Sequence, residues 1–432
     1  MKKVITYGTF DLFHQGHYNI LKRAKEYGDY LIVGVTGDTY DNERGKLSVQ
    51  DSLVTRIKNV MATGFVDEVI VEEYLGQKTG DIIKYGIDVF VIGSDWYGKF
   101  DHLKEYCEVV YLERTRNISS TMLRNKEGSV FMVGIATDSH DEGGIVEETK
   151  YVSGLHIESI FNEDESISKS LADEFEIDSS FDDYSDFCNG VNLVCIKMAT
   201  EKRYKYIKAA LGQGKNVLSD YPFSLSRDED EELRALAQEK GVLLAESIVM
   251  MHLRAFTQIL WMAQDGAIGK ILNVNASISS GKNSSSFKFS DAVTVAVVAL
   301  VKILGCDVQD ARVLRREGTD GIESSTIIAE YKNTVAHIII GNNLSFGNKL
   351  EIIGEKGTIT VKDEWWNTGY FRVDLKSSES PNRYSINFEG NGYRFVLQEA
   401  LIQMKEKRAQ GGRITQKESN AMIDLFKLAQ GD

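Results

Sequence analysis

The stretch YGTFDLFHQGHYNI, from Tyr7 to Ile20, places two histidines, His14 and His17, three residues apart. It joins the β-branched run KKVITY to HYNILKRAKEYG, whose apolar spacing predicts an amphipathic helix that ends at Gly28. The histidines therefore lie where the first strand ends and the first helix begins. In a parallel sheet this place suits phosphate, because a helix N-terminus carries unpaired N–H groups.

Two histidines at positions i and i+3 share one face of a helix, and both imidazoles can donate to phosphate oxygens. Gly8 lets the backbone approach a ligand, and Gly16 keeps the start of the helix free of a blocking side chain. Taken alone, an H-x-x-H pair fits a chance pair, half of a metal site or a nucleotide site. The stretch by itself leaves these three interpretations open.

The composition is that of an ordinary globular protein, with 42% apolar and 26% charged residues among 432. This length predicts two or three domains. The net charge of −14 argues against broad binding of nucleic acid or anionic membranes, and no apolar run is long enough to predict a membrane span. The start lacks the apolar core of a signal peptide, and the four cysteines have no metal-ligand or disulfide spacing. We therefore expect a cytoplasmic protein.

The order of apolar runs predicts an α/β protein with three domains. Short continuous strands alternate with helices up to about residue 126, a pattern typical of a buried parallel sheet. A second βα series follows the charged segment LRNKEGSVF, and long alternating strands after about residue 250 predict an antiparallel sheet flanked by helices. We expect domains at 1–128, 129–250 and 251–432: two Rossmann-like domains, then an α/β domain with a large, mostly antiparallel sheet.

Three ordered motifs make the first domain resemble a known family. A strand followed by G-T-F-D and H-x-G-H is the signature of the HIGH-motif nucleotidyltransferase superfamily. RTRNISST, from Arg114 to Thr121, looks like the R-T-x-x-I-S-T-T signature of cytidylyltransferases, and GSDW, from Gly93 to Trp96, resembles the glycerol-3-phosphate cytidylyltransferase family. The resemblance implies transfer of CMP from CTP to a small polyol phosphate, first of all sn-glycerol 3-phosphate. The products would be pyrophosphate and a CDP-polyol such as CDP-glycerol, a precursor of teichoic acid or capsular polysaccharide.

The resemblance also implies roles for individual residues of this chain. The implied catalytic residues are His14, His17, Lys46 and Arg114. The implied nucleotide-binding residues are Thr9, Phe10, Asp11, Gly16, Asp95, Arg114, Thr115, Ser119 and Ser120, and the implied ligands of the substrate phosphate are Arg44, Lys46 and Arg56. Mg²⁺ is expected with CTP, but no carboxylate cluster dictates its ligands, so no metal site of the protein itself is predicted.

Two positions depart from the family pattern. Arg44 stands where the family has a lysine, which keeps the charge but changes its geometry, and Leu75 replaces an aromatic residue of the mid-domain loop. The acceptor is therefore less firmly predicted than the use of CTP. The absence of a predicted general base has a chemical reason: a phosphate monoester is already ionised at pH 7, so the protein has to position two anions and stabilise developing charge.

From about residue 129 the chain resembles the Gfo/Idh/MocA oxidoreductase family. The segments that carry the resemblance are AALGQGKNVLSDYPFSLS, AIGKILNVNASIS and LEIIGEKGTITV. The family fold is a Rossmann domain followed by a domain with a large open sheet that is often used for assembly. We therefore expect a homo-oligomer.

The positions that family redox chemistry needs are changed in this chain. TDSHDEGG stands where a G-x-G-x-x-G phosphate loop is expected, and Asp138 and Asp141 there would repel a pyrophosphate. The acid expected after the second strand is displaced to Glu163, Tyr221 replaces the lysine of E-K-P, and Val295 stands where the histidine belongs. We predict a redox-inactive region that does not bind NAD(P).

Two alternatives remain open for the C-terminal region: a second, NAD(P)-dependent activity on the CDP-polyol, or a scaffold that recruits a partner. A ligand bound without redox turnover is a further alternative. Tyr221 is expected to be structural, although a role as an acid in place of the lysine is the competing interpretation. The scattered histidines His140, His156, His252 and His337 are expected at the surface or in packing, and Trp365 and Trp366 at an interface, in a pocket or in the sheet.

Overall fold

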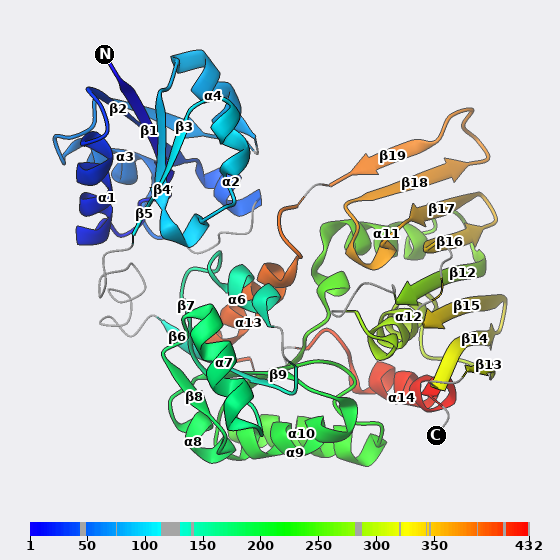
Figure 1. Ribbon diagram of the computed structural model, residues 1–432. Helices are drawn as coiled ribbons and strands as arrows, with labels where there is room; N and C mark the ends of the chain where they lie inside the picture. The colour runs from blue at the N-terminus through cyan, green and yellow to red at the C-terminus, as the bar shows by residue number, and fades with distance from the viewer. Residues whose placement is uncertain are drawn as a thin grey trace. The chain divides into compact units, whose positions relative to one another are not determined.

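The chain forms two compact units, residues 1–131 with 150–156, and residues 132–149 with 157–432 (Figure 1). The structure is a computed structural model that describes residues 1–43, 49–74, 76–113, 130–139, 142–280, 287–318, 321–342, 344, 347–386, 388–408 and 412–430. Among these residues, no helix combines the length and the apolar character needed to span a bilayer. The two units are described separately below.

The first unit contains a five-stranded, all-parallel sheet. The strands are β1 (Lys3–Gly8), β2 (Tyr30–Thr36), β3 (Glu68–Glu72), β4 (Val89–Gly93) and β5 (Glu108–Leu112), in the order β3-β2-β1-β4-β5. Successive residues of a strand point to opposite faces, and both faces of this sheet are covered. Val4 thus packs in one apolar cluster and Ile5 in another, with neither side chain exposed. This two-sided burial explains the continuous apolar runs of the sequence.

Helices cover both faces of this sheet. They are α1 (Gln15–Lys25), α2 (Asp38–Glu43), α3 (Leu53–Met61) and α4 (Gln77–Tyr85), with the short turns η1 (Ser94–Trp96) and η2 (Asp101–Glu105) after β4. Leu21 of α1 and Val60 of α3 belong to one cluster, and Ile82 of α4 belongs to the other. The strand order reverses between β1 and β4, so the carboxyl ends of these two strands flank the place where open α/β sheets bind ligands.

The second unit begins with another parallel sheet, whose order is β11-β10-β9-β6-β7-β8. Its strands are β6 (Phe131–Thr137), β7 (Leu155–Phe161), β8 (Ser179–Phe181), β9 (Leu193–Lys197), β10 (Asn216–Ser219) and β11 (Leu244–Glu246). Its helices are α6 (Gly143–Thr149), α7 (Glu165–Phe175), α8 (Tyr184–Asn189), α9 (Thr200–Gly212) and α10 (Arg227–Lys240). Here the strand order reverses between β6 and β9.

An eight-stranded sheet completes the second unit, in the order β13-β14-β15-β12-β16-β17-β18-β19. The strands are β12 (Ile271–Ser280), β13 (Asp310–Gly318), β14 (Gly321–Tyr331), β15 (Thr334–Asn342), β16 (Lys349–Gly354), β17 (Gly357–Lys362), β18 (Tyr370–Leu375) and β19 (Asn382–Ser385). Every neighbouring pair is antiparallel except β12 and β15, which are parallel. The predicted fold class, with two Rossmann-like sheets and a large, mostly antiparallel sheet, is confirmed.

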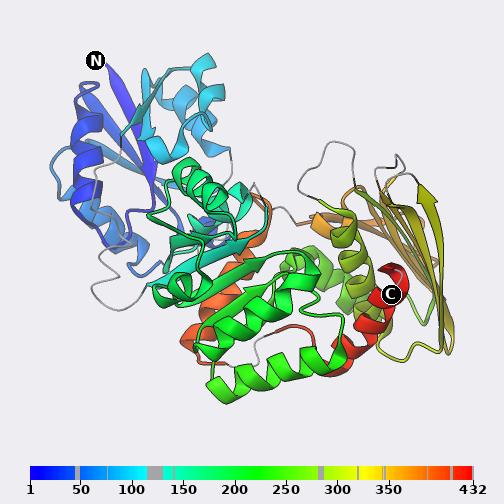
Figure 2. The ribbon, with the colours of Figure 1, turned by 60° about the horizontal axis from the view of Figure 1, so that its bottom comes forward.

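The remaining helices pack against these two sheets. They are η3 (Val249–His252), α11 (Arg254–Gln264), α12 (Phe289–Leu304), η4 (Trp365–Asn367), α13 (Tyr393–Lys405) and α14 (Gln416–Gln430). Figure 2 shows α12 and α14 on one face of the large sheet. Trp365 is fully buried and donates from Nε1 to the carbonyl of Ser277, so of its three predicted settings it takes burial in the sheet.

The predicted domain boundaries stay predictions. The boundary near Gly128 lies outside the described residues, and the second unit holds both the second parallel sheet and the large sheet.

Candidate active site

The turn between β1 and α1 lies at the carboxyl end of the central strand of the first sheet. Phe10 and Leu12 have left-handed backbone conformations, with φ of 55° and 47°. Such conformations cost a non-glycine residue about 1–3 kcal/mol, and they cluster at functional sites. The backbone of this turn is therefore held in shape by contacts with other parts of the fold.

His14 is the N-cap of α1 and uses its ring for that purpose. Its Nδ1 accepts hydrogen bonds from the backbone N–H groups of Gly16, at 3.0 Å, and His17, at 3.4 Å. Because Nδ1 is an acceptor, the proton of the neutral ring is assigned to Nε2. His14 therefore offers an N–H donor at Nε2.

The ring of His17 stacks on that of His14, with centroids 3.8 Å apart and planes inclined by 19°. Phe10 and Phe13 lie beside His17, with ring centroids at 5.4 and 5.5 Å. The two imidazoles predicted to act together are thus brought together, in a partly apolar setting at the helix N-terminus.

Asp11 and Thr9 tie this turn to neighbouring elements. Oδ1 of Asp11 accepts from the backbone N–H groups of Gln50 and Asp51, at 3.0 and 2.9 Å. The hydroxyl of Thr36 lies 3.2 Å from that of Thr9. Thr9 and Asp11 are both 4% exposed, so they shape the site from beneath.

Arg56, predicted to bind the substrate phosphate, is fully buried beneath the turn. Its guanidinium donates to the carbonyls of Thr9 and Thr36, at 2.8 and 2.9 Å, and to the carbonyl of Asp51. It also pairs with the carboxylate of Asp38. These bonds occupy four of the five N–H donors of an arginine, which favours a positioning role for Arg56 over direct contact with phosphate.

The other predicted site residues divide into two groups. Asp95 lies in η1, directly after β4, and so shares the carboxyl edge of the sheet with the β1–α1 turn. Arg44, Lys46, Arg114, Thr115, Ser119 and Ser120 lie outside the described residues, as does Leu75.

A polar cluster beside the turn was missed by sequence reasoning. Lys78, from the first turn of α4, pairs with Glu72 at the end of β3, and its amine lies 4.6 Å from the ring centroid of Tyr7. The Tyr7 hydroxyl donates to Asp81 at 2.8 Å, and burial together with Asp81 raises the pKa of Tyr7. Glu72 is 1% exposed, and its Oε2 receives no hydrogen bond from any described residue. No motif in EEYLGQK predicts this cluster, because its side chains meet only after α4 packs against the sheet.

In the second unit, two carboxylates accept hydrogen bonds at the carboxyl ends of β6 and β9. Thr137 donates to Glu142 at 2.6 Å, and Asp138 accepts the backbone N–H of Ala199, the N-cap of α9, at 2.8 Å. Carboxylates of the chain therefore stand where a dinucleotide pyrophosphate would need N–H donors.

Lys197, at the end of β9, also faces a carboxylate, with Nζ 3.7 Å from Asp220. Tyr221 turns away into the core, where it is 2% exposed and its hydroxyl lies 2.8 Å from that of Ser419. Its burial raises its pKa. This geometry favours the structural interpretation of Tyr221 over a role as an acid.

Comparisons with known proteins divide the chain in the same way. A cytidylyltransferase-like family model matches residues 5–126, and a model of the oxidoreductase family with an NAD-binding Rossmann fold matches residues 107–247. The chain is 53% identical over 130 residues to the glycerol-3-phosphate cytidylyltransferase of Bacillus spizizenii, covering all of that protein and 30% of this chain. It is 48% identical over 126 residues to the enzyme of the same name from Staphylococcus aureus, covering 95% of that protein and 29% of this chain.

Solved structures resemble the second part of the chain. A 3-ketoreductase from Actinomadura kijaniata superposes with a TM-score of 0.61 at 17% identity, covering 69% of this chain and 96% of the reductase. The UDP-N-acetylglucosamine 3-dehydrogenase of Acidithiobacillus ferrooxidans gives a TM-score of 0.58 at 15% identity, covering 70% of this chain and 97% of that protein. At such identities the likeness concerns the fold alone.

Proposed function

The chain belongs, through residues 5–126, to the cytidylyltransferase family, and on that basis we propose that it transfers CMP from CTP to sn-glycerol 3-phosphate. The products are CDP-glycerol and pyrophosphate, which would serve the synthesis of teichoic acid or capsular polysaccharide. The observation that carries this proposal is the 53% identity to a complete glycerol-3-phosphate cytidylyltransferase, joined to the stacked, helix-capping histidine pair.

The transfer reaction needs hydrogen-bond donors to the phosphates and correct positioning of the two substrates. An ionised oxygen of the acceptor phosphate attacks the α-phosphorus of CTP, a new P–O bond forms, and the bond to the bridging oxygen of the β-phosphate breaks. Pyrophosphate leaves with the electron pair of that bond. His14, through Nε2–H, and His17 stabilise negative charge on the phosphates, and the N-terminus of α1 adds its dipole. Mg²⁺ that arrives with CTP neutralises part of the triphosphate charge.

Glu72 and Lys78 are proposed as part of the acceptor subsite. Lys78 is a cation whose ammonium lies beside Tyr7, one residue before the turn. The second oxygen of the buried Glu72 carboxylate has hydrogen-bonding capacity left over and suits a hydroxyl of the polyol. A buried carboxylate oxygen that receives a hydroxyl only from the correct acceptor would favour polyol phosphates over simple phosphates.

The test is release of pyrophosphate by the full chain with CTP, UTP, GTP or ATP against a panel of polyol phosphates. We expect turnover with CTP and sn-glycerol 3-phosphate above all other pairs. Preference for ATP, or no turnover with any acceptor, would contradict the proposal.

We further propose that the second unit is redox-inactive and does not bind NAD(P). The support is the pair of carboxylates, Asp138 and Glu142, at the end of β6, together with the burial of Tyr221. Titration of the full chain with NADH and NADPH should give no saturable binding. Micromolar binding would favour the competing function, an NAD(P)-dependent conversion of the CDP-polyol.

A further inference from the structure

A cleft of about 480 Å³ opens beside the first turn of α11, in the second unit. It is lined by His252, Arg254, Thr257, Gln258, Trp261 and Arg413. Its volume is in the range of small-molecule sites, which run from about 300 to 1,000 Å³. The cytidylyl transfer proposed above uses none of these residues.

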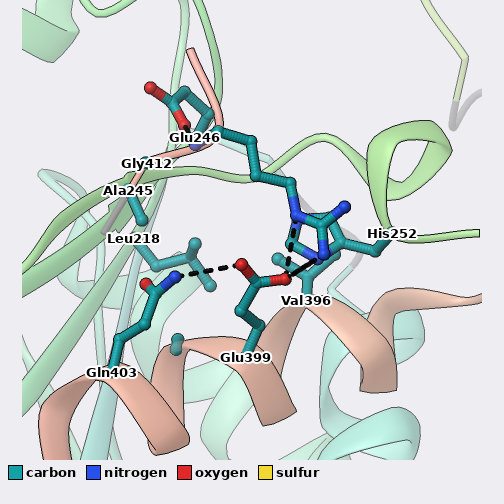
Figure 3. Close-up of a pocket in the computed structure, with 10 residues that line it drawn as sticks. Leu218, Ala245, Glu246, His252, Val396, Glu399, Gln403 and Gly412 are labelled. Atoms are coloured by element: carbon teal, nitrogen blue, oxygen red, sulfur yellow. Dashed lines mark hydrogen bonds and ion pairs between the residues drawn. The ribbon is translucent and has the colours of Figure 1, made fainter. Parts of the chain in front are cut away.

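The floor of the cleft is a histidine held by a carboxylate. The side chain of His252 is 7% exposed, and its Nδ1 lies 3.0 Å from Oε2 of Glu399. Glu399 comes from α13 and also accepts from Nε of Arg413 at 2.9 Å and from Gln403 at 3.0 Å. Figure 3 shows Glu399 between His252 and Gln403. The two atoms are close, although their alignment is not that of a hydrogen bond.

Because Nδ1 is the nitrogen that lies beside Glu399, Nε2 is the nitrogen left to face a ligand. Burial raises the pKa of Glu399, but His252 and Arg413 outweigh it and hold that pKa at about 2, whereas burial lowers the pKa of His252. A neutral ring beside a carboxylate carries its proton on Nδ1, which leaves Nε2 as an acceptor. Nε2 of His252 has no hydrogen-bond partner among the described residues, and the side chain lines the cleft.

The walls of the cleft carry excess positive charge. Arg254 is exposed and forms no ion pair with any described acid, while Arg413 is paired with Glu399. Arg254 is also the first residue of α11, whose first turn has no acidic residue and whose N-cap, Leu253, supplies no side-chain hydrogen bond. A cation is unfavourable at a helix N-terminus, so an anion bound there would be stabilised twice, by Arg254 and by the helix dipole.

The rim of the cleft offers a flat apolar surface. Trp261 lies two turns along α11 from Arg254 and is 59% exposed. An exposed tryptophan is a common platform for the apolar face of a ring, and its indole N–H remains a donor. The cleft thus combines a cation that can bind an anion (Arg254), an acceptor for a hydroxyl group (Nε2 of His252) and an apolar surface for a ring (Trp261).

We propose that this cleft binds a phosphate monoester of a sugar. The phosphate lies at Arg254 and the N-terminus of α11, a sugar hydroxyl donates to Nε2 of His252, and the ring lies against Trp261.

The experiment titrates the full chain with ribose 5-phosphate and follows tryptophan emission. We expect saturable quenching that is lost in Trp261→Phe, which locates the signal in the cleft. Arg254→Ala should weaken binding at least tenfold and Arg254→Lys less, because the lysine keeps the charge. Arg312→Ala, an exposed arginine of β13 outside the cleft, is the matched control and should bind as the unchanged protein does.

Two partial probes separate the contributions. Ribose without phosphate and inorganic phosphate without sugar should each bind more weakly than ribose 5-phosphate. His252→Gln should lower the affinity for ribose 5-phosphate toward that for inorganic phosphate, with circular dichroism as the check on folding. Equal binding by the unchanged protein and Arg254→Ala, quenching that survives Trp261→Phe, equal binding of inorganic phosphate, or no binding of any probe would each overturn the proposal.

Discussion

His14 caps α1, and we propose that it also donates to phosphate. His14→Asn keeps a good N-cap acceptor but loses the Nε2–H donor, whereas His14→Ala loses both. We expect both variants to lower kcat by about 10²–10³-fold, as removal of a charge-stabilising donor does. Only His14→Ala should also lose about 1 kcal/mol of unfolding free energy in urea titration. An active His14→Asn would contradict the donor role.

We expect Arg56 to contribute to the stability of the fold and not to bind the substrate directly. Arg56→Ala removes a donor from three backbone carbonyls and a positive charge from the buried carboxylate of Asp41, which should cost about 3–5 kcal/mol of unfolding free energy. If Arg56 binds the acceptor phosphate instead, the variant will unfold as the unchanged protein does and show only a raised KM for the acceptor. Urea titration and KM measured on the same samples decide between the two.

Substitution of Glu72 should change the KM for the acceptor phosphate and not the KM for CTP. In Glu72→Gln the carboxylate that pairs with Lys78 is replaced by a neutral amide of the same size. We expect a roughly tenfold rise in the KM for sn-glycerol 3-phosphate, since one charged hydrogen bond is weakened, with the KM for CTP unchanged. A change in the KM for CTP of the same size would place Glu72 outside the acceptor subsite.

Those parts of the site whose residues are close together in the sequence could be predicted. His14 and His17 are neighbours on one helix turn, so strand, turn and spacing suffice to bring them together. The burial of Arg56 depends on carbonyls of Thr9 and Thr36, which come from other elements. His252 was expected in surface or packing positions, because its partner Glu399 lies on a helix far along the chain.

Among the elements, α13 is joined to η3 and to the segment around Arg413 by one carboxylate. Because the pKa of Glu399 is held at about 2, below its ordinary value of 4.5, this carboxylate stabilises the fold fully above about pH 5, and the contribution is lost as the pH falls toward 2. The unfolding free energy should therefore fall less between pH 5 and pH 2 in Glu399→Gln than in the unchanged protein. The difference between the two falls should be about 3 kcal/mol at most. An unchanged pH profile would contradict this linkage.

In the large sheet, the strands could be predicted from the sequence, but their pairing could not. The alternating runs ILNVNASIS and TVAHIIIGN predict strands, and β12 and β15 are found there. The sequence could not indicate that these two strands run parallel, because β13 and β14 come between them along the chain while β15 reaches β12 in space. Pairing of distant strands is decided by packing of the whole sheet.

For the whole molecule, we expect a homo-oligomer formed through the face of the large sheet opposite α12. The register places Leu314, Thr326 and Ile339 side by side on that face, and Leu314 and Ile339 are 65% and 46% exposed. Leu314→Glu with Ile339→Glu should lower the molar mass measured by light scattering to that of one chain. Lys332→Glu, in the β14–β15 turn, is the control. A single-chain mass for the unchanged protein would contradict the expectation.

The cap at the start of α1 has a further consequence. In many enzymes a carboxylate selects the tautomer of a working histidine, but at His14 two peptide N–H groups of the helix do so. Because both amides point at Nδ1, the helix leaves Nε2 as the ring nitrogen that can face a ligand. Hydrogen exchange at the amides of Gly16 and His17 should therefore become faster in His14→Ala, which removes their common acceptor. The start of the helix thus orients the side chain that is proposed to act at its own N-terminus.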